Sequence, residues 1–376
     1  MMKKVGFLIN PVSGIGGRVG LKGSDGENIQ TEAFKKGAVA EAAPKTSVAL
    51  SFVSDKESID LYAASGIMGG DLARSLGFHI KIVYEPMRPT TAEDTINAVR
   101  TMLKEEVDVI VFSGGDGTAR DVLTAFQQEG SDIKTPVIGI PTGVKIHSAV
   151  YANNPKSAGL ALSSFMKVNK PPLAEREVMD IDEDKFRDGI VSARMFGYLS
   201  VPVVRKLFQH PKTASRFAGD DVMGIYHELR EYIEKNPDFV YVWGTGSTMC
   251  KTMEKLGFEG SLLGVDAVID GQIVLKDASE SELIALLSGK KAKLIVSVIG
   301  GQGHIFGRGN HQLSPAVLRL IGLNNIMIAA SAQKIFDLEN HTLYVDTSDP
   351  ELDKSLSGYR KVIVGWQEQL VCKVDC

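Results

Sequence analysis

Several features of secreted, membrane-bound and nucleic-acid-binding proteins are missing from this sequence. The three cysteines are an odd number without metal-ligand spacing, so a reducing, cytoplasmic compartment is expected. The sequence has no block of like charges, so neither a charged tail nor a membrane-binding patch is predicted. The net charge of −4 and the pI near 6.0 argue against nucleic acid as the main partner.

The sequence also lacks a long apolar run. Its first apolar stretch, residues 5–10, follows two lysines but is short and ends in Asn-Pro, so neither a signal peptide nor a membrane partner is expected. The chain is long and apolar enough for two domains with sizeable cores, because it has 376 residues of which 44% are hydrophobic.

The stretch around which the chain is organised is DVIVFSGGDGT at residues 108–118. Its apolar part, 109–112, predicts an interior strand of a parallel sheet that is covered by helices on both faces. The glycine loop follows at the carboxyl end of that strand, where open α/β sheets bind ligands, and a helix starts directly after it. Backbone N–H groups there suit a phosphate, although the same residues are also good turn formers. The candidate phosphate-binding residues are Gly114, Gly115, Gly117 and Thr118, with Asp116 as the only ionisable group among them.

Two other loops are predicted at the same edge of the sheet. NPVSGIGGR at 10–18 follows the strand 5–10, and PTGVK at 141–145 follows the strand 136–140. Glycine, hydroxyl and lysine groups in such loops suit a phosphate, although each loop by itself is a weak signal. His147 is expected to cap or pack rather than to act as a base. The candidate residues of these two loops are Asn10, Ser13, Gly14, Thr142, Gly143 and Lys145.

Strand and helix patterns alternate through the first half of the chain. Strands are predicted at 58–63 and 78–84, with a helix at 68–76 and another that begins with a Thr90–Glu93 capping box. This alternation predicts an α/β fold with a parallel, Rossmann-like sheet and right-handed crossovers.

The composition changes near Lys170-Pro171-Pro172, where we place a linker to a second domain. Alternating residues at 177–182 and 190–198 predict a hairpin. Its acidic turn has carboxylates of the kind that bind Mg²⁺, but an exposed turn is the simpler interpretation.

A second loop of the phosphate-binding type is GTGST at 244–248, between a strand at 239–243 and a helix at 249–256. The alternative is a tight strand-to-helix turn. After a strand at 294–299, the glycine-rich segment 300–311 contains an arginine whose planar group suits phosphate or carboxylate. The candidate residues of these segments are Thr245, Gly246, Ser247, Thr248 and Arg308.

The GGDGT pentapeptide resembles the signature of the NAD kinase and diacylglycerol kinase superfamily, and NP-x-SG-x-GG is similar to the first loop of those families. GTGST is similar to a TGST segment of NAD kinases, although sugar-phosphate isomerases bind phosphate with GTGST as well. In the order of these motifs the whole chain is similar to the ATP-NAD kinase family, in its longer bacterial branch that includes proteins encoded beside acetoin-catabolism genes.

The resemblance implies transfer of a phosphoryl group from ATP, with Mg²⁺, to the 2′-hydroxyl of the adenosine ribose of NAD, which gives NADP. By position in the motif, Asp116 would be the base. The resemblance also implies a homo-oligomer. It predicts a nucleotide-binding domain at 1–170, a second substrate-binding domain of mixed α/β or β-rich type at 171–335, and a segment at 336–376 that returns to the first domain.

One expected feature is not found in the sequence. Shorter NAD kinases have an Asn-Glu or Asn-Asp pair that grips the nicotinamide ribose, and we find no such pair here. Two alternatives therefore stay open. The first is a kinase of the same fold that acts on another small-molecule or lipid hydroxyl, and the second is a nucleotide-binding regulatory protein without catalysis.

Overall fold

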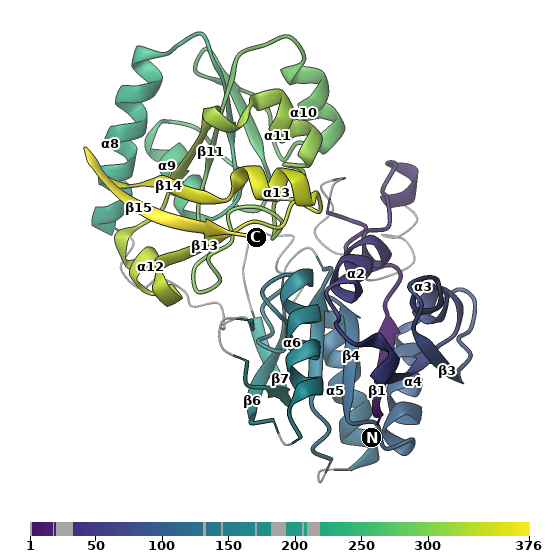
Figure 1. Ribbon diagram of the computed structural model, residues 1–376. Coiled ribbons are helices and arrows are strands. Elements are labelled where there is room, and N and C mark those ends of the chain that lie inside the picture. The colour runs from purple at the N-terminus through teal and green to yellow at the C-terminus, as the bar shows by residue number, and fades with distance from the viewer. Residues whose placement is uncertain are drawn as a thin grey trace. The chain divides into compact units, whose positions relative to one another are not determined.

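The computed structural model describes residues 2–17, 19, 33–130, 133–143, 146–169, 171–181, 193–204, 207–208 and 219–376. The chain forms two compact units (Figure 1). Of the described residues, the first unit contains 2–15 and 39–208, and the second contains 16–17, 19, 33–38 and 219–376.

The first unit is built on a five-stranded sheet in the order β3-β2-β1-β4-β5, and all neighbouring strands are parallel. This confirms the predicted Rossmann-like sheet. The strand 109–112 is an interior strand, as predicted, because β4 pairs with β1 on one side and β5 on the other. The strands are β1 (Lys3–Ile9), β2 (Ile59–Ala64), β3 (His79–Tyr84), β4 (Val109–Gly114) and β5 (Val137–Pro141).

Helices cover both faces of this sheet. On one face α2 packs with α3 and α6, and on the other α4 packs with α5, as right-handed crossovers require (Figure 1). Phe7 and Phe112 are fully buried between these layers, so the central strands have no wet face. The helices are α2 (Ala42–Ser51), α3 (Gly70–Ser75), α4 (Ala92–Lys104), α5 (Asp116–Glu129) and α6 (Pro155–Lys167), with short 3₁₀ turns η1 (Lys56–Ser58) and η2 (Gly66–Met68).

The capping box of α4 lies one residue later than predicted. The N-cap is Thr91, and the carboxylate of Asp94 accepts a 2.8 Å hydrogen bond from the backbone N–H of Thr91. Asp94 also accepts from the amide of Met87 and the hydroxyl of Tyr84. Burial pushes the pKa of Asp94 upward, but these hydrogen bonds outweigh burial, so the pKa is lowered.

The predicted hairpin is present as β6 (Leu173–Ile181) and β7 (Ala193–Pro202), which pair in antiparallel fashion. Its acidic turn lies outside the described residues. Val178 and Leu199 belong to the core of the first unit. The hairpin is therefore part of that unit, which differs from the predicted boundary at 170, because the Pro-rich stretch precedes a strand that still packs on the first core.

The second unit contains an eight-stranded mixed sheet in the order β10-β9-β8-β11-β12-β14-β15-β13. Strands β8, β11, β12 and β14 are parallel to their neighbours in this series, while β9 and β15 run antiparallel to β8 and β14. The strands are β8 (Val240–Trp243), β9 (Asp266–Ile269), β10 (Gln272–Leu275), β11 (Ala292–Val296), β12 (Ile326–Ala329), β13 (Thr342–Tyr344), β14 (Gly358–Gly365) and β15 (Glu368–Asp375).

Helices of the second unit connect these strands. The longest of them, α8, packs on β14 and α9. The helices are α8 (Gly219–Lys235), α9 (Ser247–Lys255), α10 (Glu280–Leu287), α11 (Pro315–Ile321), α12 (Ala332–Phe336) and α13 (Pro350–Leu356), with 3₁₀ turns η3 (Leu323–Asn325) and η4 (Glu339–His341).

The last residues do not follow the expected course. Strands β13, β14 and β15 all belong to the second sheet, and residues 336–376 lie in the second unit. Val362, Cys372 and Val374 are buried in its core. The return to the first domain, implied by resemblance alone, is thus replaced by a terminal hairpin that completes the second sheet.

Candidate functional site

The predicted loops of the first unit meet where the strand order of its sheet reverses. The chain leaves β1 toward β2 and leaves β4 toward β5, although β1 and β4 are neighbours. In open α/β sheets the crevice beyond the carboxyl ends of such strands is the usual ligand site. Asn10 after β1 donates a 2.9 Å hydrogen bond from Nδ2 to Thr118 Oγ1 after β4. The two loops are therefore tied together at this point.

Hydroxyl groups connect the third predicted loop to the other two. Thr142 after β5 lies 3.1 Å from Ser13 Oγ and 3.4 Å from Ser113 Oγ, at hydrogen-bond distance from both. All three hydroxyl-bearing residues are buried. The structure thus brings together Asn10, Ser13, Thr118 and Thr142. Lys145 lies outside the described residues.

The glycines of these loops have a packing role. A Cβ on Gly14 would lie 2.3 Å from the carbonyl oxygen of Thr142, and Gly14 has φ of +81°. A Cβ on Gly143 would lie 2.6 Å from Cα of Gly115, and one on Gly114 would meet the side chain of Thr118. Glycine is therefore required here for close backbone approach, whether or not a ligand binds. Gly115 and Gly117 are partly exposed.

The N-terminus of α5 supplies hydrogen-bond donors at the same place. Gly115 is the N-cap, and Ala119 is the first residue whose amide bonds back to the helix cap, at 3.1 Å from Gly115 O. The preceding amides of residues 116–118 are those that an α-helix leaves without a carbonyl partner from its own backbone. Together with the helix dipole they favour an anion, so the predicted phosphate loop leads into a helix start that is chemically suited to phosphate.

Asp116 is placed at the start of α5 with its carboxylate turned into the protein. Its side chain is 5% exposed. Oδ2 accepts a 2.7 Å hydrogen bond from the amide of His147 and lies 3.1 Å from His147 Nδ1, while Oδ1 accepts from the amide of Ser148 at 3.0 Å. Both oxygens thus hold the segment that follows β5. The role of Asp116 as a base stays a prediction.

The segment that Asp116 holds is fixed on its other side by β6. Ser148 Oγ donates to Met179 O at 2.8 Å and accepts from Met179 N at 3.0 Å, and the amide of Ala149 donates to Glu177 O. Tyr151 OH donates to Gly115 O, back at the phosphate loop. Sequence reasoning missed these residues, because no local pattern shows that the chain after β5 returns to the start of α5.

The GTGST loop has a comparable setting in the second unit. It follows β8 beside β11, and Gly244 N donates to Ile295 O at 2.8 Å. Gly246 has φ of +114°, which favours glycine, and it is the N-cap of α9. Thr248 Oγ1 accepts a 2.7 Å hydrogen bond from Lys334 Nζ. A helix start with hydroxyls and a lysine is chemically suited to phosphate.

The glycine-rich segment 300–311 is a packed loop rather than an open one. His304 is fully buried and forms a parallel bridge with Tyr344. Gly307, with φ of +87°, lies so close to the carbonyl of Asp346 that a Cβ would be 1.9 Å from it. Arg308 is only 2% exposed. The side chain of Arg308, which was predicted to bind phosphate or carboxylate, is therefore buried within the second unit.

A buried acid lies in the part of the second unit that packs on this segment. Asp353 Oδ1 accepts hydrogen bonds from the amide of Thr347 at 2.9 Å and from its hydroxyl at 2.6 Å. Burial raises the pKa of Asp353 to about 6, and the nearby carboxylates of Asp346 and Asp349 act in the same direction. Asp353 thus holds Thr347 in place, and the residue before Thr347, Asp346, lies against Gly307.

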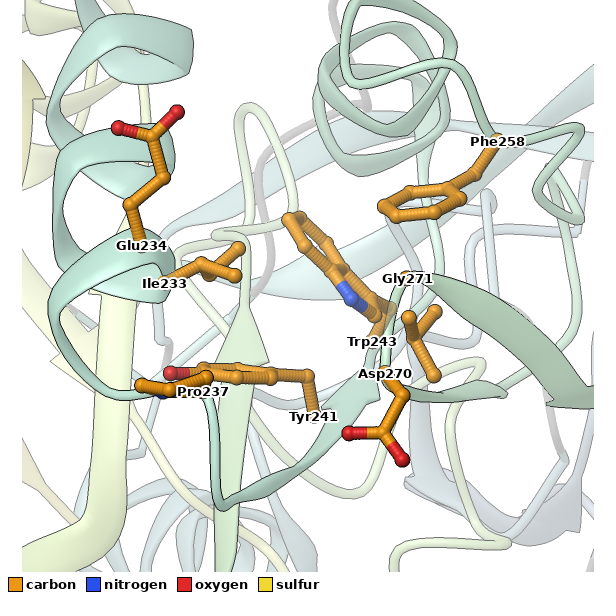
Figure 2. Close-up of a pocket in the computed structure, with 9 residues that line it drawn as sticks. Ile233, Glu234, Pro237, Tyr241, Trp243, Phe258, Asp270 and Gly271 are labelled. Carbon is orange, nitrogen blue, oxygen red and sulfur yellow. The ribbon is translucent and has the colours of Figure 1, made fainter.

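A separate pocket of about 190 Å³ lies between the end of α8, β8 and the β9–β10 turn. Figure 2 shows the rings of Tyr241, Trp243 and Phe258 in it, with the carboxylates of Glu234 and Asp270 turned away from the rings. The lining has no lysine, arginine or histidine. It contains none of the predicted site residues and does not suit a phosphate.

Within the described part of the chain, no group of three or more His, Cys, Asp or Glu side chains could hold a metal ion. No helix in that part is long and apolar enough to cross a membrane.

Comparisons with known proteins place the chain in a family. No curated protein matches. Among solved structures, "a putative diacylglycerol kinase" from Bacillus anthracis str. Sterne is 14% identical with a TM-score of 0.24, and the match covers 48% of this chain and 46% of that one. A diacylglycerol kinase structure from the same organism is 15% identical with a TM-score of 0.23, and the match covers 48% of each chain. This chain thus spans about half the length of each, and likenesses this distant carry no argument about substrate.

The family models are more informative. The ATP-NAD kinase N-terminal domain model matches residues 5–169, which include β1 to β5 and the three loops of the first unit. The ATP-NAD kinase C-terminal domain model matches residues 236–374, which include the GTGST loop and the terminal hairpin. Together the two models match most of the chain, in the expected order. The chain therefore belongs to the ATP-NAD kinase family.

Proposed function

We propose that this protein transfers the γ-phosphoryl group of ATP to the 2′-hydroxyl of the adenosine ribose of NAD and so forms NADP. The observation that carries the proposal is the match of both ATP-NAD kinase domain models to one chain. A phosphotransferase is the coarser statement that this match supports, and NAD as the acceptor is the finer one that we add.

The arrangement at the start of α5 fits the needs of phosphoryl transfer. This reaction requires positioning and neutralisation of charge more than covalent chemistry by the protein. The amides of residues 116–118 and the helix dipole supply positive potential, and the Asn10 to Thr118 hydrogen bond holds two of the surrounding loops in place. Asp116, the ionisable group of the loop, is assigned to the handling of the acceptor proton.

Magnesium is part of the proposal as a component of the nucleotide substrate. Mg²⁺ in kinases is commonly held by one or two carboxylates together with substrate phosphates. Asp116 is the carboxylate nearest the α5 amides, but its oxygens already accept hydrogen bonds from His147 and Ser148. These residues do not form a preformed Mg²⁺ site. They fit an ion that enters with ATP and takes most of its ligands from phosphate and water.

The test is formation of NADP by the purified full-length protein with ATP, Mg²⁺ and NAD, read by an NADP-specific dehydrogenase. Reactions without ATP or without NAD are the controls, and NADH and polyphosphate replace NAD and ATP in parallel samples. NADP formation that needs both substrates is the expected result. Transfer of labelled phosphate only to a lipid or another small hydroxyl would contradict NAD as acceptor. Thermal stabilisation by ATP without any turnover would instead indicate a regulatory nucleotide-binding protein.

A further inference from the structure

The aromatic pocket of the second unit contains none of the residues assigned to the proposed reaction, yet it has the properties of a ligand site. Tyr241 and Trp243 form its buried floor, at 3% and 0% exposed, and the half-buried ring of Phe258 lies beside them (Figure 2). Its volume of about 190 Å³ is far larger than the roughly 10–15 Å³ that one water molecule needs. The pocket therefore has room for a small organic ligand.

The charged side chains that line this pocket are all carboxylates in the described part of the chain. Glu234 lies on the last turn of α8, and Asp270 lies on the β9–β10 turn. The charge of Glu234 is offset by Arg230, whose Nε lies 2.7 Å from it. Asp270 is exposed, and its carboxylate has no ion pair or hydrogen bond with any other described residue. The lining thus has an uncompensated negative charge at its rim.

The end of α8 adds to this negative potential. The helix ends at Lys235, and Ile233 and Pro237 on either side of that end both line the pocket. The C-terminal end of a helix has a partial negative charge, and the charge of Lys235 is itself paired with Glu231 at 2.6 Å. Burial raises the pKa of Tyr241 to about 12, which shows that the floor of the pocket is poorly hydrated. Aromatic rings attract cations more strongly in such surroundings.

We propose that this pocket binds a small organic cation with an alkylated ammonium group. The alkyl groups pack on the rings and on Ile233, and the positive charge is attracted by Asp270 and by the end of α8. The same groups disfavour an anion, and they give a neutral ligand no electrostatic gain. The site shares no residue with the loops assigned to phosphoryl transfer, so the inference goes beyond the proposed function and does not depend on it.

The first experiment compares two probes of the same shape. Choline has a quaternary nitrogen where tert-butylethanol has a carbon atom, so the two molecules differ chiefly in charge. Each is titrated into the full-length Trp366→Phe variant, in which Trp243 is the remaining tryptophan and reports on the floor of the pocket. Sodium chloride keeps the ionic strength equal. We expect choline to bind about 5- to 30-fold more tightly than tert-butylethanol.

Two further variants in this background test which groups provide the selectivity. Asp270→Asn removes the charge, and asparagine tolerates the φ of +49° at this position. Phe258→Leu removes a ring and keeps the wall apolar. Each change should lower the ratio of the two affinities about two- to fivefold. The matched control is Glu351→Gln, which removes an exposed carboxylate on α13, outside the pocket lining, and should leave the ratio unchanged.

Several results would overturn the inference. Equal affinity for choline and tert-butylethanol would show that apolar contact alone explains the binding, and tighter binding of the tert-butylacetate anion would contradict the sign of the charge. Saturation-transfer NMR of the choline methyl protons detects binding that leaves the fluorescence unchanged, and its absence would exclude this class of ligand. An effect of Glu351→Gln as large as that of Asp270→Asn would assign the selectivity to the net charge of the unit. If Phe258→Leu does not fold in a thermal melt, the ratio in the parent variant and in Asp270→Asn still decides.

Discussion

The close approach of two loops in the first unit gives a prediction that needs no ligand. Gly14→Ala would place a Cβ 2.3 Å from the carbonyl oxygen of Thr142, at a residue with φ of +81°. Gly77→Ala is the matched control, because Gly77 has φ of +80°, lies in the same unit, and would direct a Cβ into open space with no packed neighbour within 4 Å. The two variants differ only in what the new methyl group meets.

The size of the effect follows from two contributions. A left-handed backbone costs an alanine about 1–2 kcal/mol, and this applies equally to both variants. Overpacking against a backbone atom that cannot move away costs about 1–3 kcal/mol more, and only Gly14→Ala meets such an atom. The smaller entropy of an unfolded chain with alanine is the same in both and cancels. We therefore expect Gly14→Ala to destabilise the first unit by about 1–3 kcal/mol more than Gly77→Ala.

The measurement has to report on the first unit alone. Both tryptophans, Trp243 and Trp366, lie in the second unit, so their fluorescence is unsuitable. Hydrogen exchange of peptides that cover β4 reports the opening free energy of the first core. The expected difference corresponds to exchange about 5- to 150-fold faster in Gly14→Ala than in Gly77→Ala. Equal exchange in the two variants would show that the loop after β1 does not pack on the loop after β5.

Two further predictions concern single side chains. Since the pKa of Asp353 is raised to about 6 in the folded state from 3.8, its protonation stabilises the second unit below about pH 4, and roughly 3 kcal/mol is lost as the pH rises through 6. Asp353→Asn should remove that loss, as read by urea unfolding with tryptophan fluorescence, and an unchanged pH dependence would contradict the assignment. Asn10→Ala removes the hydrogen bond to Thr118 and should raise KM for ATP about fivefold. Asn97→Ala, whose side chain bonds to Glu93 and Arg100 on α4 and to Tyr84 on β3, should not change KM.

The parallel sheet and its loops could be predicted because the signals are local. The run 109–112 is apolar without alternation, which specifies a strand buried on both faces, and a glycine loop after such a strand lies at the carboxyl edge wherever the strand sits. Strand order then decides which loops are neighbours. The alternation of strands and helices was enough to expect right-handed crossovers, and the loops after β1, β4 and β5 do meet.

Contacts between distant segments could not be predicted in the same way. The Asp116 to His147 pair depends on the chain after β5 turning back and adding to β6, and nothing near residue 147 in the sequence encodes that course. The terminal hairpin was assigned by resemblance to the first domain, whereas burial of Cys372 and Val374 places it on the second core. The β9–β10 hairpin was missed although Asp270-Gly271, both with positive φ, is a recognised turn signal.

The glycines of GGDGT bear on function less directly than their spacing suggests. Gly114 meets Thr118 and Gly115 meets Gly143, so a tight fold of three loops explains both residues without a ligand. What packing does not explain is a helix start whose first amides lie at the switch point of the sheet. The case for ligand binding at this site therefore depends on the α5 amides, and the glycines serve to bring the three loops together around them.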